Sequence, residues 1–190
     1  MRHAMTQKIS NDLKESQIDW KVILAFIPIA FLTYLFHELG HWTFGELLGN
    51  DMTLSLNNSA PSGGFFKNDN SALWSAIGGP AFTVLQGLIF LLITWVTKSN
   101  VAYSTVFFAV FSRFFSLVFG GIDLQDEARI ASMLHTSKYF TAAIVLLTLF
   151  VILWISTRIM KISIKGIGYY LVLGVVSIMI VIGFNEIFLV

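Results

Sequence analysis

The chain has 190 residues, of which 56% are hydrophobic and only 12% are charged, and its formal net charge is +1. A soluble domain carries roughly 25% charged residues, so this composition excludes a soluble globular protein. The small net charge, without any basic cluster, excludes a nucleic-acid partner. The absence of cysteine excludes disulfides and thiolate ligands, so a metal ion would have to be held by His, Asp or Glu.

The apolar residues are concentrated in five long segments. Continuous apolar runs of about 18 residues or more indicate membrane-spanning helices, because a strand of a membrane barrel would alternate apolar and polar residues. We therefore predict an all-α membrane protein, a polytopic bundle of about five transmembrane helices. After a polar N-terminal segment at residues 1–21, residues 22–190 form one transmembrane domain. The expected spans are residues 22–48, 72–96, 101–121, 139–157 and 167–184.

The first predicted span contains the sequence HELGH, in which Glu38 lies between His37 and His41. Residues four apart lie on one face of a helix, so both imidazoles can bind one tetrahedral zinc ion while Glu38 acts as general base. Insertion of one ionisable side chain at the centre of a membrane helix costs about 2.5–3.5 kcal/mol, so three such residues within about one turn indicate a function. Solvated histidines near the interface are the alternative, but they explain neither the spacing nor the intervening Glu.

A polar segment, residues 50–70, follows the first span. It contains short runs rich in strand-forming residues at 52–56 and 65–66, with glycines between them. This pattern predicts a small β-hairpin at the membrane surface.

A catalytic zinc ion usually has a third protein ligand and one open position. The first and third spans end on the same side of the membrane, so the acidic segment after the third span arrives beside the histidines. Glu46 is a weaker candidate for the third ligand because it lies shortly after His41 on the same helix. Spacing alone does not choose among the other candidates, which are Asp123, Asp126, Glu127 and His135.

These motifs resemble those of the site-2 proteases, a family of intramembrane zinc metalloproteases. HELGH matches the first signature of the family, and QDEARI is similar to its later L-D-G-G-R-like segment, with Asp126 at the ligand position and Glu127 in place of a Gly. Residues 79–83 resemble a G-P-x-x-N element, with Thr83 in place of the Asn. The resemblance covers residues 31–134 and favours Asp126 over Asp123 as the third ligand.

The resemblance implies that residues 22–190 form a metalloprotease-like domain, an intramembrane zinc endopeptidase that cleaves a transmembrane segment of another membrane protein. His37, His41 and Asp126 would hold Zn²⁺, which lowers the pKa of a bound water. Glu38 would be the catalytic residue that takes the proton of this water and passes it to the leaving amine.

The same interpretation predicts the partners and the location of the protein. The hairpin could pair with an unwound substrate strand by edge addition, and Asn57 and Asn58 are the candidate substrate contacts. The expected partners are a membrane-protein substrate, the lipid bilayer and a regulatory membrane partner that gates access. We expect a multi-pass protein of a bacterial or archaeal cell membrane.

The alternative function is a non-proteolytic zinc-binding membrane protein, such as a transporter or a sensor. Gln86 and Arg113, polar residues within the spans, would then mark a conduction path. Five unequal spans without a repeat do not fit the paired broken helices of transporters. For either function, Gln86 and Arg113 should face the bundle interior and find partners there.

The orientation in the membrane stays open. Lys and Arg residues outside the spans lie mostly on the side of the N-terminus, which predicts that this side is cytoplasmic and that the histidines lie toward the opposite face. The family resemblance instead implies a site nearer the cytoplasmic face.

Overall fold

The computed structural model describes residue 7 and residues 11–188, and in this part of the chain five helices are long and apolar enough to cross a membrane. They are α2 (Trp20–Leu47), α3 (Asp69–Thr97), α4 (Asn100–Phe119), α6 (Lys138–Met160) and α7 (Ile164–Phe188). Their bounds lie within a few residues of the five predicted spans. The chain is thus a helical, multi-pass membrane protein, as its sequence predicts.

A short helical segment at residues 11–15 precedes α2, and the other short elements of the described chain lie between the spans. A two-stranded antiparallel sheet of β1 (Met52–Leu54) and β2 (Ser59–Pro61) follows α2. A 3₁₀ turn, η1 (Ile122–Leu124), and a short helix, α5 (Asp126–Met133), connect α4 to α6.

The predicted hairpin is confirmed, but its second strand was placed wrongly. Residues 65–66 belong to an irregular segment that leads into α3, and the strand that pairs with β1 begins earlier, at Ser59. At the end of the hairpin opposite its turn, the Ser62 amide donates to the Asp51 carbonyl oxygen at 2.7 Å. Beyond this point Gly64 adopts a positive φ of 80°, which glycine tolerates and which turns the chain away from the sheet.

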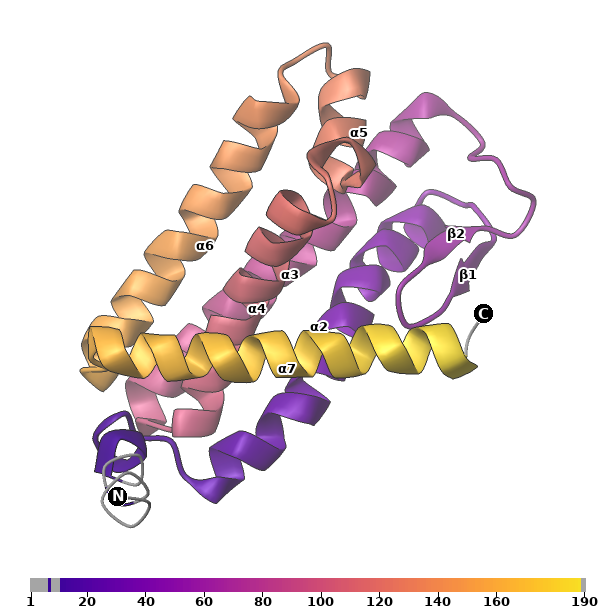
Figure 1. Cartoon of the computed structure of the whole chain (residues 1–190). Helices are drawn as coiled ribbons and strands as arrows, with labels where there is room; N and C mark the ends of the chain where they lie inside the picture. Colours follow the sequence, from indigo (N-terminus) through magenta and orange to yellow (C-terminus); the bar gives the residue numbers. More distant parts are fainter. Residues whose placement is uncertain (1–6, 8–10, 189–190) are drawn as a thin grey trace.

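Helix α3 lies at the centre of the bundle and contacts α2, α4, α5 and α6. Figure 1 shows α7, in yellow, crossing in front of these helices at a large angle, while the hairpin and α5 lie toward the end of the molecule away from the N-terminus. The hairpin packs on α2, whereas α5 packs on α3 and α6.

Glycines allow α2 and α3 to pack backbone against backbone. A Cβ atom on Gly40 of α2 would collide with the carbonyl oxygen of Gly78, and a Cβ atom on Gly78 would collide with that of Gly40. Small residues permit this kind of close approach between membrane helices. The contact places the start of α3 against the histidine-bearing turns of α2.

Aromatic side chains fill the bundle around the other half of α2. Phe26 of α2 meets Phe108 of α4 edge to face at a centroid distance of 6.2 Å, and it meets Tyr170 of α7 at 5.9 Å. Tyr170 in turn packs edge to face on Tyr103 of α4 at 5.0 Å. These rings are almost fully buried, and they join α7 to α2 and α4.

Candidate metal centre

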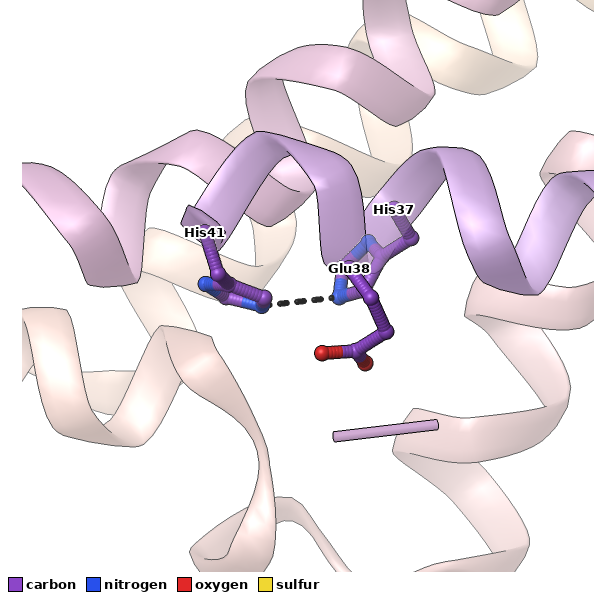
Figure 2. Close-up of side chains that lie close together, drawn as sticks. All are labelled: His37, Glu38 and His41. Carbon is purple, nitrogen blue, oxygen red and sulfur yellow. Dashed lines mark hydrogen bonds between the residues drawn. The ribbon is translucent and has the colours of Figure 1, made fainter. Parts of the chain in front are cut away.

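His37, Glu38 and His41 form a group that could hold a metal ion. Figure 2 shows the three side chains on one side of α2, with the two imidazole rings turned toward each other. The Nε2 atoms of the two histidines are 3.2 Å apart, and one ligand atom from each of the three residues lies within 4.8 Å of the others. The predicted clustering of this motif on one helix face is therefore present.

Helix α3 fixes the orientation of both imidazoles. The Nδ1 atom of His41 lies 2.7 Å from the Ser75 carbonyl oxygen, and that of His37 lies 2.8 Å from the Thr83 hydroxyl. The Thr83 hydroxyl itself donates to the Gly79 carbonyl oxygen at 3.1 Å, so it accepts the hydrogen of His37 Nδ1. Both rings are thereby held with Nε2 directed into the site, as metal-binding histidines commonly are.

Asp126, the first residue of α5, lies against the two imidazoles. Its Oδ2 atom is 3.1 Å from His37 Nε2, and its Oδ1 atom is 3.4 Å from His41 Nε2. Burial alone would raise the pKa of Asp126, but its contacts with the two imidazoles outweigh burial and hold this pKa well below its usual range. The carboxylate oxygens of Asp126 and the Nε2 atoms of the two histidines thus face one another, and a proton or a metal ion could lie between them.

The rival aspartate occupies a different environment. The side chain of Asp123 is 74% exposed and pairs with Lys138 at the start of α6. The structure thus brings Asp126, and not Asp123, to the histidines.

The remaining ligand candidates point elsewhere. Glu127 is fully buried and bonds to Arg113, and His135 is exposed beyond the end of α5. The Oε1 atom of Glu46 accepts a hydrogen bond from the Met52 amide at 2.8 Å, which fixes the first strand of the hairpin to α2.

Gln86 and Arg113, the two polar span residues singled out from the sequence, both have partners inside the bundle, as expected. Gln86 donates to the Thr33 hydroxyl at 2.8 Å. Arg113 is 6% exposed, and it donates from Nε to Glu127 at 2.8 Å and from Nη2 to Asp126 at 3.1 Å. Arg113 therefore lies one contact away from the histidine group.

A cavity of about 240 Å³ opens beside the histidine group. The hairpin contributes the exposed residues Asn57 and Asn58 to its wall, and Arg129 of α5 is also part of the lining. The predicted substrate contacts, the predicted catalytic residue Glu38 and Asp126 thus share one cavity.

Comparison with known proteins gives no match, whether to a family model, to a curated protein or to a solved structure. The likeness to the site-2 proteases rests on short motifs alone. The chain itself establishes a multi-pass helical bundle with a His-Glu-His group that could hold a metal ion.

Proposed function

We propose that the protein is an intramembrane zinc endopeptidase in which His37, His41 and Asp126 are the zinc ligands. The observation that carries this proposal is the spacing of their ligand atoms, which is 3.2 Å between the two Nε2 atoms and 3.1 and 3.4 Å from these atoms to the carboxylate. Zinc–ligand bonds of about 2.0–2.1 Å place the ligands of a tetrahedral site about 3.3–3.4 Å apart. The two Nε2 atoms and the carboxylate, which offers Oδ2 to His37 and Oδ1 to His41, are thus spaced like three ligands of such a site.

The surroundings of the three ligands favour a catalytic site over a structural one. Structural zinc ions are enclosed by four protein ligands, whereas catalytic ones keep an open position. Here the group faces a cavity that also holds Glu38. Because Glu38 is close enough to be a ligand itself, its role as a base is what an experiment has to test.

A zinc ion bound there would lower the pKa of a water molecule and polarise the scissile carbonyl group. Glu38 is placed to accept the proton of the attacking water and to donate it to the leaving amine. Thr83 and the Ser75 carbonyl group keep the histidines in one tautomer and one orientation.

The position of the group within a membrane span favours a membrane-embedded substrate. A transmembrane helix hides its peptide groups in internal hydrogen bonds and must unwind before attack. The hairpin beside the cavity offers backbone groups that could pair with the unwound strand, and Asn57 and Asn58 are the proposed side-chain contacts.

The decisive variant is Glu38→Gln, tested with a single-span substrate co-reconstituted in vesicles. We expect full zinc content and a loss of cleavage of about 10²–10⁴-fold, because the amide cannot accept the proton. Glu46→Gln on the same helix is the matched control, since an amide oxygen can still accept from the Met52 amide, and it should cleave normally.

Each other outcome has a definite meaning. Undiminished cleavage by Glu38→Gln would contradict the proposed role of Glu38 as general base. Loss of zinc in that variant would indicate that Glu38 is itself a zinc ligand. Wild-type protein without stoichiometric zinc would remove the proposal altogether. Zinc binding without cleavage of any membrane substrate by the wild type would favour the non-proteolytic alternative.

A further inference from the structure

Arg113 is a buried cation in a membrane-spanning helix, and its partners are two neighbouring carboxylates. Its Nε and Nη2 atoms both donate to Glu127, and Nη2 also donates to Asp126 Oδ2 at 3.1 Å. Glu127 is fully buried. An arginine in this position costs several kcal/mol unless it is paired, so the arrangement calls for an explanation.

The two carboxylates come from the first turn of α5, while Arg113 comes from α4. The paired hydrogen bonds with Glu127 hold the guanidinium plane in place, since this geometry fits a carboxylate in only a few ways. The remaining bond then reaches Asp126 Oδ2, the same oxygen that lies beside His37, while Oδ1 faces His41. Arg113 thus restricts the rotation of the Asp126 side chain.

The charges of Arg113, Glu127 and Asp126 do not cancel. One guanidinium and two carboxylates leave one negative charge, and the double contact assigns Glu127 as the main counterion of Arg113. The charge of Asp126 stays available for a cation between the imidazoles. Without Glu127, Arg113 would rely on Asp126 alone and would compete with that cation for the carboxylate.

We infer that Arg113 and Glu127 are positioning residues that orient Asp126 and preserve its charge for metal binding. This inference rests on the proposed metal site. The competing explanation is that the Arg113–Glu127 pair only fastens α5 to α4 and has no effect on the site. The two explanations differ in what happens when both charges are removed together.

The test is the double variant Arg113→Met/Glu127→Leu in the full-length protein in detergent. Replacing a buried ion pair by apolar side chains of similar size is often neutral for stability, so thermal unfolding should stay close to wild type. Asp126 loses its hydrogen-bond donor, and loss of such outer partners typically weakens metal binding by about 10–100-fold. We expect the dissociation constant for Zn²⁺, measured by chelator competition, to rise by that factor.

A matched control removes a different buried polar pair between helices. Thr33→Val/Gln86→Leu eliminates the 2.8 Å contact between α2 and α3 but touches none of the proposed ligands. Its zinc affinity should equal that of the wild type. Co²⁺ substitution gives a second readout, since the visible absorption of the bound ion should change in the Arg113/Glu127 variant and not in the control.

Wild-type zinc affinity in a folded double variant would overturn this inference and leave the proposed function standing. Absence of zinc from the wild type would instead overturn the proposed function. If the double variant does not fold, Glu127→Gln decides the matter, because it keeps the side-chain shape but removes the neutralising charge. Weaker zinc binding by Glu127→Gln supports the inference, and unchanged binding overturns it.

Discussion

The two halves of α2 pack against the bundle in different ways. Near the N-terminal end, Phe26 lies among the rings of Phe108 and Tyr170, in contacts that have no polar component. Near the C-terminal end, His37 and His41 are held by single hydrogen bonds of 2.8 and 2.7 Å to α3. The position of Phe26 depends on side-chain volume, whereas the orientation of the two imidazoles depends on individual polar atoms of α3.

This difference separates stability from chemistry along a single helix. Removal of a ring from the aromatic half leaves a cavity, which lowers the free energy of unfolding but moves no ligand atom directly. Removal of the Thr83 hydroxyl group of α3, which contacts His37 in the polar half, changes little volume but releases an imidazole. Substitutions in the two halves should therefore have effects on different measured quantities.

The largest effect on stability is expected for Phe26→Ala. The ring is 1% exposed and joins three helices, and loss of a buried Phe costs about 3–5 kcal/mol in soluble cores. In a membrane the hydrophobic contribution is absent, so we expect a loss near the lower limit, about 3 kcal/mol. Leu24→Ala, at a site that is 59% exposed on the same helix, is the control and should change stability little.

The zinc content of Phe26→Ala tests whether the aromatic contacts of α2 affect the geometry of the proposed metal site. Phe26→Ala should keep stoichiometric zinc at temperatures at which the protein is folded. Loss of zinc in the folded variant would show that the aromatic half also sets the geometry of the site, and the comparison of the two halves would fail.

For Thr83→Val we expect a loss of zinc affinity without a comparable loss of stability. The valine preserves the shape of the side chain but cannot accept the hydrogen bond from His37 Nδ1, so zinc affinity should fall by about 10–100-fold with a small change in unfolding temperature. Thr83→Ser keeps a hydroxyl group and should restore binding. Thr94→Val is the matched control on the same helix, because Thr94 Oγ1 has no hydrogen-bond partner among the described residues. Equal zinc affinity in Thr83→Val and the wild type would contradict the orienting role.

The sequence predicted the features that depend on local pattern. Apolar runs located all five long helices, because the cost of exposing polar groups to lipid leaves few alternatives. The spacing of HELGH placed His37, Glu38 and His41 on one face of a helix, since helix geometry is fixed. The polarity of Arg113 within a span correctly indicated that it faces the bundle interior and has a partner there.

Features that depend on contacts between distant segments were harder to predict. Ser75 orients His41 through its backbone carbonyl group, which carries no sequence signal. The second strand of the hairpin depends on where the chain turns, and the aromatic residues at 65–66 suggested a strand that does not form. The family motif named the position of Thr83, but only the structure shows the contact of its hydroxyl with His37.

The smallest effect is expected for Asp123→Asn, and it sharpens the assignment of the third ligand. Asp123 is exposed and its partner Lys138 is partly exposed, and pairs of this kind contribute about 0–1 kcal/mol. Stability and zinc content should therefore stay close to those of the wild type.

Asp126→Asn alters the same chemical group three residues later, beside the two imidazoles, and should lose zinc. Measurement of zinc per chain in both purified variants compares two aspartates that share one short connection and differ only in what they face. Loss of zinc in Asp123→Asn together with full zinc in Asp126→Asn would transfer the ligand role to Asp123, and α5 would then have to begin in a different orientation from the one that the Arg113 contacts impose.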